Sequence, residues 1–516
     1  MRKLIIFLFS VLPMLLFGQY TYFNTYMPAP NQGTAGGFCS QLFISGSNLT
    51  TLGLYNDFNN FQRTNYQLSM NGDLLGQYDF DLPNLGFCYQ QLSDASRMLP
   101  NGKIISALSY EDLDYFLFPK VTCYNEDWTE DWSFEWHEYD TLEFRLSAEY
   151  HTVIQCSNGE YIAAGPLGMD TIPDEIGDTH CDFIMTRFTE EGTVVWHKRI
   201  PFHLGTYFDD PSNFLRVNDI TELSNGDLLA WGAWYADWDP MVVRFDANGN
   251  FISEHHWGSP QYDDWLPWPV QVSDSTFLFA YSRGFDALNE FNVFHNPIIG
   301  LFNANQMEIE WEIEHNYVHT FGEITDFEKL DDNTFVLLGY GYPDSNNPGR
   351  AFMLAVDAQG NELWQQEYWP PQAYLTPTAM DLEITPDGGL AYAGNFFRVD
   401  ENHNPIDQVT WVVKTDGCGE EVFNGCTSAV AELAIENSKL KISPNPASSV
   451  VNLSSEQEIK SITIRDVTGK IVLQQQMNNH ELQTQIDVNR LATGLYLIEA
   501  NFGNNRVVAQ RLVKQE

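Results

Sequence analysis

The sequence predicts an all-β protein: a seven-bladed β-propeller followed by a small C-terminal β-sandwich. A pair of hairpin turns recurs along the chain at a regular interval, and no stretch shows the 3.6-residue periodicity of an amphipathic helix. The charge balance also changes near residue 437, which separates two bodies. We therefore expect the propeller over residues 19–426, a linker over 427–438 and the sandwich over 439–516.

Each repeat contains two tight turns flanked by short β-rich runs. The clearest copy turns at Asn225-Gly226 and again at Asn248-Gly249, a dipeptide that suits a two-residue hairpin with positive φ at both central positions. Two hairpins give four consecutive strands per unit. The second turns begin at positions 71, 125, 191, 248, 305, 359 and 416, which are 54 to 66 residues apart. Seven such units predict one propeller blade each.

An open solenoid is the alternative arrangement of these units. It would leave a face of each end unit uncovered and would call for distinct capping repeats. The end units turn at Asn71-Gly72 and Asp416-Gly417, like the others. This similarity favours a closed ring.

Residues 385–394 (TPDGGLAYAG) and 356–364 (VDAQGNELW) resemble the repeats of a broad class of bacterial secreted proteins. That resemblance implies the fold and no single activity. The second segment also resembles the tryptophan-docking motif of quinoprotein propellers. It implies that Trp364, and Trp196 at related spacing, pack between neighbouring blades. No cofactor pocket is indicated.

The two bodies differ in charge. From Asn437 onward nine Lys and Arg stand against seven Asp and Glu, whereas the preceding residues hold the other 17 basic and 63 acidic side chains. So acidic a body repels phosphates and anionic lipids, which argues against binding of nucleic acid or a membrane surface. The charge fits solubility, calcium binding or a cationic partner.

Binding residues are expected on one rim of the propeller. In a four-stranded up-and-down blade, the tight turns joining strands one to two and three to four lie on the same rim. The other connections gather on the opposite rim, here called the long-loop rim, and comprise residues 166–182, 201–216, 257–269, 340–350, 369–377 and 398–408. Loops on a rigid frame commonly carry function.

Two acidic and aromatic segments occupy corresponding positions of neighbouring units on this rim. The candidate ligand-binding residues are Tyr207, Asp209, Asp210, Tyr262, Asp263, Asp264, Trp265 and Trp268. Their carboxylates suit calcium and their exposed rings suit sugar stacking, although aspartates at such places also cap loop N–H groups. A second calcium candidate, without the EF-hand spacing, consists of Asp174, Glu175 and Asp178. No other cofactor is indicated.

Two functions therefore stay open. The first is a non-catalytic propeller that binds a glycan, a protein or a divalent cation at the long-loop rim. The alternative is a carbohydrate-active enzyme that uses Asp209, Asp210, Asp263 or Asp264 as acid and base. No metalloprotease, P-loop or α/β-hydrolase motif occurs in the sequence, but this does not exclude an enzyme, because propeller active sites are assembled from distant loops. The binding protein is our first expectation.

Seven cysteines in an exported protein allow up to three disulfides. Cys418 and Cys426 are the expected pair because they are close in sequence at the end of the propeller. Cys156 and Cys181 stand on either side of a long loop and form a further candidate pair.

The first 18 residues have the pattern of a secretory signal peptide. Met1-Arg-Lys3 is basic, residues 4–17 are mostly apolar, and Gly18 ends a plausible cleavage site. The apolar run has about fourteen residues, fewer than the roughly twenty that span a bilayer. We expect an exported protein without a transmembrane segment.

Four segments near the C-terminus occur in a defined order: 442–447 (ISPNPA), 464–472 (IRDVTGKIV), 491–498 (LATGLYLI) and 511–514 (RLVK). They resemble the type A C-terminal sorting domain of type IX secretion cargo in Bacteroidetes. The resemblance implies recognition by the outer-membrane secretion machinery and a product that is released or attached to the cell surface. Alternating runs at 461–465, 470–473, 484–487, 495–499 and 506–510 predict the strands of its sandwich.

Overall fold

The computed structural model describes residues 22–515 except 28–35, 46–47, 57–60, 82–87, 90–94, 112–116, 140–144, 147, 168–181, 202–214, 235–238, 259–263, 286–293, 316–321, 342–348, 373, 401–403, 421–440, 444, 446, 467–470, 493 and 504–505. The chain divides into two compact units, Met1–Cys426 and Thr427–Glu516. No helix among the described residues has the length and hydropathy needed to cross a membrane.

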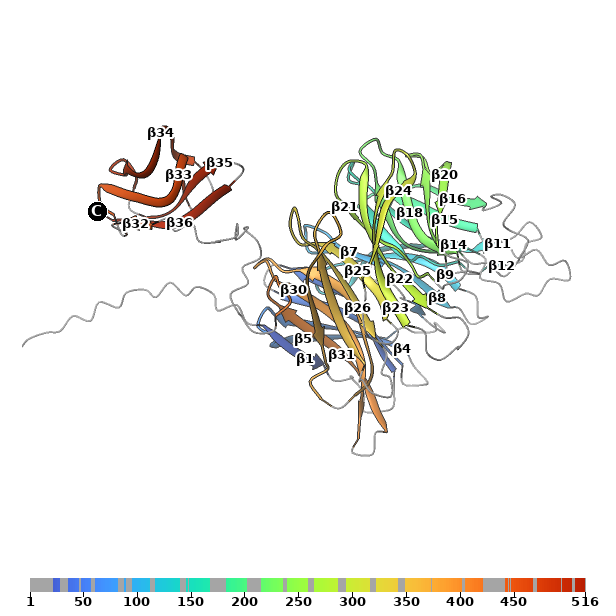
Figure 1. Ribbon diagram of the computed structural model, residues 1–516. Helices are drawn as coiled ribbons and strands as arrows, with labels where there is room; N and C mark the ends of the chain where they lie inside the picture. Colours follow the sequence, from blue (N-terminus) through green and yellow to red (C-terminus); the bar gives the residue numbers. More distant parts are fainter. Residues whose placement is uncertain are drawn as a thin grey trace, which may run out of the picture. The chain divides into compact units, whose positions relative to one another are not determined.

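Seven antiparallel blade sheets and one two-stranded ribbon make up the described part of the first unit. Figure 1 shows how they are arranged. Blade 1 contains β2 (Gly36–Ser45), β3 (Asn48–Asn56), β4 (Phe61–Ser69) and β5 (Leu74–Asp81). Blade 2 contains β6 (Cys88–Tyr89) and β7 (Ser96–Met98), both paired with β8 (Ile104–Glu111), then β9 (Leu117–Tyr124) and β10 (Glu130–Glu135). A short ribbon of β11 (Glu138–Tyr139) and β12 (Arg145–Leu146) follows.

The next four blades each use four consecutive strands. Blade 3 contains β13 (Thr152–Gln155), β14 (Tyr161–Leu167), β15 (Asp182–Phe188) and β16 (Val194–Pro201). Blade 4 contains β17 (Leu215–Glu222), β18 (Leu228–Trp234), β19 (Asp239–Phe245) and β20 (Phe251–His256). Blade 5 contains β21 (Trp268–Gln271), β22 (Thr276–Phe285), β23 (Phe294–Asn303) and β24 (Glu308–Glu314). Blade 6 contains β25 (Gly322–Lys329), β26 (Phe335–Gly341), β27 (Arg350–Val356) and β28 (Glu362–Tyr368).

Blade 7 combines the two ends of the propeller. It contains β29 (Tyr374–Ile384), β30 (Leu390–Val399) and β31 (Pro405–Thr415), and its outermost strand is β1 (Phe23–Met27). β1 runs antiparallel to β31 with Thr25 opposite Val412 (Figure 1). The sequence predicted four consecutive strands for this unit, and that prediction is wrong because the N-terminal strand occupies the fourth place.

The innermost strands establish that the ring is closed. β2, β7, β13, β17, β21, β25 and β29 contact one another in that order, and β29 contacts β2. Each pair of neighbouring blades also has its own apolar core, such as the core of Ile154, Met185 and Val243 between blades 3 and 4. The prediction of a seven-bladed propeller is confirmed.

The described tight turns lie where the sequence predicts them, but the turn at Asn225-Gly226 is longer than the two residues expected. At Asn225-Gly226 the Gly226 N–H donates to Leu223 O at 2.8 Å, and the Leu223 N–H donates to Asp227 O at 2.8 Å. Gly226 has φ 86°, whereas Asn225 is not among the residues with positive φ. The hairpin is therefore a type I turn closed by a left-handed glycine, which leaves three residues in the loop.

Large side chains dock each blade onto the next one. The Trp196 indole of blade 3 lies against the second turn of blade 4, where a Cβ on Gly249 would be 2.9 Å from its ring. Trp364 and Gly419 repeat this contact between blades 6 and 7, and Phe23 of β1 and Gly72 repeat it between blades 7 and 1. Packing of Trp196 and Trp364 between neighbouring blades is therefore confirmed. The tight-turn rim is occupied by these docking contacts.

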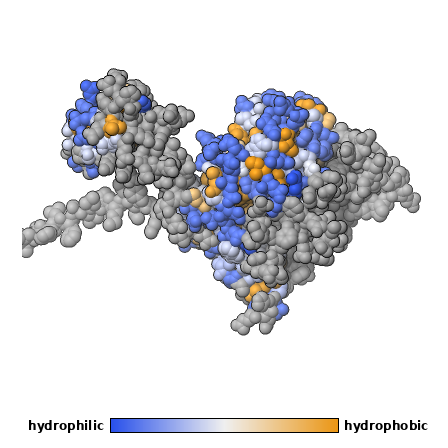
Figure 2. All heavy atoms as spheres, viewed as in Figure 1, coloured by the Kyte–Doolittle hydropathy of each residue, from blue (hydrophilic) through white to orange (hydrophobic). Residues whose placement is uncertain are grey.

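The outermost strands carry many of the acidic residues. In β24, Glu308, Glu310, Glu312 and Glu314 alternate with half-buried apolar residues. Carboxylates on an open strand edge discourage pairing with a second chain. Figure 2 shows the described face as mainly hydrophilic, with hydrophobic residues in small separate groups.

A buried ion pair in blade 7 joins β31 to the turn between β29 and β30. Lys414 Nζ, with a side chain that is 0% exposed, lies 2.6 Å from Asp387 Oδ2. Burial opposes ionisation of Asp387, but hydrogen bonds from Lys414 and Thr385 outweigh it, so the pKa of Asp387 is held below its ordinary value. The ionised carboxylate is thus part of the folded structure.

We expect Asp387→Asn to lower the free energy of unfolding by about 3 kcal/mol at pH 7, because Lys414 loses its counter-ion. A depressed folded pKa stabilises the protein above the unfolded pKa of about 4, and this contribution is lost as the pH falls through the folded pKa. The wild type should therefore lose more stability than the variant between pH 5 and pH 3. Urea unfolding at both pH values measures this, and equal losses in the two proteins would contradict it.

The second unit is a small β structure built on a long bent hairpin. Its strands are β32 (Lys441–Ser443), β33 (Val450–Asp466), β34 (Ile471–Asp487), β35 (Gly494–Gly503) and β36 (Arg506–Lys514). The first half of β33 pairs with β32 and the second half with β35, while β34 pairs along both halves. Val451, Ile462, Ile486 and Ile498 share one buried core. The predicted runs lie in strands, but those at 470–473 and 484–487 belong to the single strand β34 and not to two strands.

Candidate functional site

The strand order separates the two kinds of connection as predicted. Each tight turn joins strand one to two or three to four, so the remaining connections reach the opposite, long-loop rim. Most residues of those connections lie outside the described part of the chain. These include the predicted ligand residues Tyr207, Asp209, Asp210, Tyr262 and Asp263, and the predicted calcium ligands Asp174, Glu175 and Asp178.

Asp264 is described, and it does not face solvent. Its side chain is 0% exposed, and its Oδ1 lies 3.1 Å from Nε of Arg283. Arg283 also donates to the Tyr281 hydroxyl, which in turn donates to Glu312 Oε1 at 2.9 Å. Burial strongly raises the pKa of Tyr281, so its hydroxyl stays protonated. Asp264 therefore belongs to a structural network, and the expectation of a rim-exposed carboxylate here is wrong.

The two candidate tryptophans of the same loop differ. Trp268 is 3% exposed, and its indole N–H donates to Ile324 O of the next blade at 2.9 Å. Exposure of Trp268 for sugar stacking was predicted, and this is wrong because the ring closes the interface of blades 5 and 6. Trp265 is half-buried, and its backbone N–H donates to Ser282 O at 2.8 Å.

The cysteines agree only in part with the sequence-based pairs. Cys418 is disulfide-bonded, whereas Cys426 lies outside the described residues, so their pairing stays a prediction. Cys156 is a free thiol buried in the core between blades 3 and 4, and burial raises its pKa to about 12. The predicted bridge from Cys156 to Cys181 is wrong, because the Cys156 thiol is free. Cys156 begins the tight β13–β14 turn, whereas Asp182, the first residue of β15, pairs with Leu167 at the other end of the sheet.

No group of three or more His, Cys, Asp or Glu side chains suited to a metal ion occurs among the described residues. Calcium binding thus stays a prediction for the long-loop rim.

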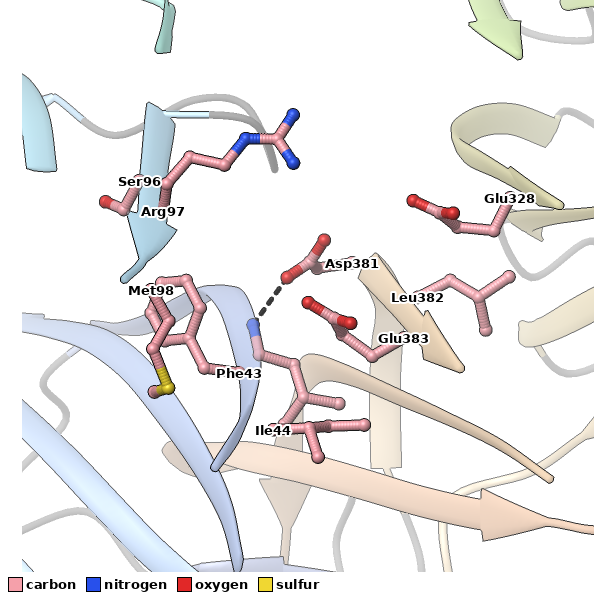
Figure 3. Close-up of a pocket in the computed structure, with 10 residues that line it drawn as sticks. Phe43, Ile44, Ser96, Arg97, Met98, Glu328, Asp381, Leu382 and Glu383 are labelled. Atoms are coloured by element: carbon pink, nitrogen blue, oxygen red, sulfur yellow. Dashed lines mark hydrogen bonds between the residues drawn. The ribbon is translucent and has the colours of Figure 1, made fainter. Parts of the chain in front are cut away.

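A cavity that the sequence analysis missed lies among the innermost strands. It has a volume of about 240 Å³ and is lined by residues of β2, β7, β25 and β29. Arg97, Glu328, Asp381 and Glu383 point toward the same space from three of these strands (Figure 3). Aligning the inner strands on their turns would have revealed charged residues at one recurring position.

Backbone contacts hold two of these side chains in place. The Leu42 N–H of blade 1 donates to Asp381 Oδ2 at 2.5 Å, and Asp381 is only 8% exposed (Figure 3). Arg97 donates from Nε to Val153 O of blade 3 at 3.1 Å. The outer end of the Arg97 guanidinium is directed into the cavity (Figure 3).

Comparison with known proteins identifies the second unit and leaves the first without an assigned activity. No curated relative matches the chain. The chain is similar to the α-L-arabinofuranosidase Arb93A of Fusarium graminearum, at 10% identity over 65% of this chain and 94% of that chain, with a TM-score of 0.41. It is also similar to the β-propeller domain of the Trilobed protease of Pyrococcus furiosus, at 9% identity over 86% and 96%, with a TM-score of 0.27. At these scores neither similarity assigns an activity.

The C-terminal comparison is specific. Residues 441–515 match the family described as Secretion system C-terminal sorting domain. This range contains all five strands of the second unit and the four segments singled out in the sequence. The second unit is thus a C-terminal sorting domain, and the chain is a type IX secretion cargo with a seven-bladed β-propeller that is secreted or attached to the cell surface.

Proposed function

We propose that this protein is a non-catalytic binding propeller that presents a glycan, a protein or a divalent cation with its long-loop rim. The observation that carries the proposal is the division of the two rims. Blade docking through Trp196, Trp364 and Phe23 occupies the tight-turn rim. The long connections differ in length and composition from blade to blade, and variable loops on a closed frame suit recognition.

Among these ligands a glycan fits the rim residues best. Tyr207, Tyr262 and Trp265 offer aromatic faces, and Asp209, Asp210 and Asp263 offer hydrogen-bond acceptors for hydroxyl groups. Trp265 is tethered by its backbone to Ser282, which restrains it at the rim. Calcium bridging the aspartates to sugar hydroxyls is compatible with this chemistry.

Catalysis is the weaker alternative. An acid/base pair needs two carboxyl groups facing the same substrate. Asp264 is fully buried against Arg283, so it does not supply one of them. A hydrolase would have to rely on Asp209, Asp210 and Asp263.

A glycan array probed with the chain lacking residues 1–18, with and without a calcium chelator, tests the function. We expect binding without turnover, and at least about a tenfold loss of affinity for Asp210→Ala and Asp263→Ala. The matched control is Asp332→Ala, because Asp332 is fully exposed in a turn of the opposite rim. Wild-type binding by both rim variants would refute the site, and shortened glycan products would refute the non-catalytic assignment.

A further inference from the structure

A residue with a left-handed backbone lies at the second tight turn of every blade. Its φ lies between 54° and 84° in all seven blades. In five blades this residue is glycine, which adopts a positive φ without a steric cost. In blade 2 it is Trp128 and in blade 5 it is Met307. A bulky side chain on such a backbone is strained, so these two residues call for a physical reason.

The five glycine turns share one contact with the preceding blade. A large ring from the outermost strand of that blade lies against each glycine, and a Cβ on the glycine would be 2.5 to 2.9 Å from the ring. The rings over Gly72, Gly192, Gly249, Gly360 and Gly419 belong, in that order, to Phe23, Trp132, Trp196, Trp311 and Trp364. Because the distances are below van der Waals contact, a docked ring and a side chain on the turn exclude each other.

The other two interfaces show the reverse arrangement. Each docking tryptophan stands four residues after the left-handed position of its own blade, as Trp132 does after residue 128. The residue at this strand position is Gly76 in blade 1 and Ser253 in blade 4. These are the blades that precede Trp128 and Met307. The strand residue is therefore small at the two interfaces where the turn residue is large.

Trp128 and Met307 pack back onto the preceding blade. Trp128 is 5% exposed and shares a core with Phe43 and Leu52 of blade 1. Met307 packs against the core that contains Leu229 of blade 4. We propose that Trp128 and Met307 are docking residues that have exchanged sides with the ring of the preceding blade. Each of the seven interfaces then takes one large side chain, from the strand or from the turn.

The exchange makes these interfaces incompatible with the common type. A ring that left out blade 1 would bring Phe23 of β1 against Trp128, so two large side chains would compete for one place. A ring that left out blade 2 would bring Gly76 against Gly192 and leave a hole. Leaving out blade 4 or blade 5 gives the same two results. The exchanged pairs are thus a device that opposes closure with six blades.

A double-mutant cycle at blades 1 and 2 tests the exchange, with urea unfolding of the chain lacking residues 1–18 followed by circular dichroism. Trp128→Gly should raise the equilibrium constant for unfolding at least about tenfold, because loss of the buried ring outweighs relief of the backbone. Gly76→Trp should raise it at least about tenfold, because Trp128 fills the interface and the Tyr78 ring lies 3.1 Å from a Cβ at this position.

The double variant recreates the arrangement of the other five interfaces. Independent effects would multiply to about a hundredfold or more, whereas we expect the double variant to be more stable than either single variant and within about tenfold of the wild type. If a single variant is unfolded in buffer, a restored urea transition in the double variant supports the exchange equally. Effects that multiply, or a double variant that does not fold, would overturn the proposal.

The second exchanged interface gives an independent repeat. Ser253→Trp and Met307→Gly should show the same compensation when they are combined. The matched control combines Gly76→Trp with Met307→Gly, which lie in different interfaces, so their effects should multiply. Compensation of equal size in this mixed pair would show that the recovery does not come from one large side chain per interface.

Discussion

Deleting residues 22–27 is expected to destabilise the propeller more than any single substitution. The deletion removes β1, so β31 becomes an open edge and Trp411, which is 0% exposed, loses the cover of Asn24 and Tyr26. It also removes the hydrogen bond from Trp411 Nε1 to Asn24 Oδ1 at 2.8 Å and the docking of Phe23 on blade 1. Loss of one strand and several buried side chains should cost at least about 5 kcal/mol, a large part of the stability of most folded proteins.

Urea unfolding followed by tryptophan fluorescence measures this loss. The single variant Asn24→Ala is the matched comparison, and it should cost only about 1 kcal/mol because it keeps the strand. A synthetic peptide covering residues 19–30 should restore part of the stability of the truncated protein. If the truncated chain unfolds at the wild-type urea concentration, closure of the ring does not depend on β1.

Gly192→Ala is expected to destabilise the protein by about 4 kcal/mol. Gly192 has φ 79°, and a Cβ there would lie 2.5 Å from the indole of Trp132 in blade 2. The left-handed backbone costs an L-residue roughly 1–2 kcal/mol, and displacing a packed ring costs a further 1–3 kcal/mol. The Trp132 indole N–H also donates to Glu190 O at 3.1 Å, so a shift of the ring endangers that contact.

Gly159→Ala provides the matched control for this effect. Gly159 has φ 87° in an equivalent turn, but a Cβ there would meet nothing within 4 Å. This variant should therefore lose only the roughly 1–2 kcal/mol of backbone strain. Urea unfolding of both variants isolates the contribution of the docked Trp132 ring. Similar losses of unfolding free energy in the two variants would show that displacing the Trp132 indole costs no free energy.

Local patterns in the sequence were sufficient for the repeating parts of the fold. Asn-Gly and related pairs mark the turns because few residues adopt the backbone that a hairpin needs, so the seven units and their strand number could be predicted. Trp196 and Trp364 were assigned to blade docking from a spaced motif, and that assignment is confirmed. The sorting domain was recognised from short segments in a fixed order, and the family match bears this out.

Long-range contacts were not encoded in such patterns. Nothing in Phe23-Asn-Thr-Tyr-Met27 indicates that this segment pairs with β31, almost four hundred residues away. The backbone N–H and C=O groups of a strand can form hydrogen bonds with any open strand edge. Asp264 and Trp268 look like rim residues in the sequence, yet Arg283 and Ile324 from neighbouring strands bury them. Burial depends on what packs above a residue, which its own neighbours in sequence do not reveal.

By itself, the sequence determined that the protein carries a C-terminal sorting domain, that it is all-β and how many blades it has, because each follows from short segments and their spacing. Only the tertiary structure decided how the ring closes, which rim residues are accessible, and that Arg97, Glu328 and Glu383 meet in one cavity. The physical reason is that closing the ring brings blade 2 next to blades 6 and 7, although Arg97 is more than two hundred residues from Glu328 and Glu383 along the chain.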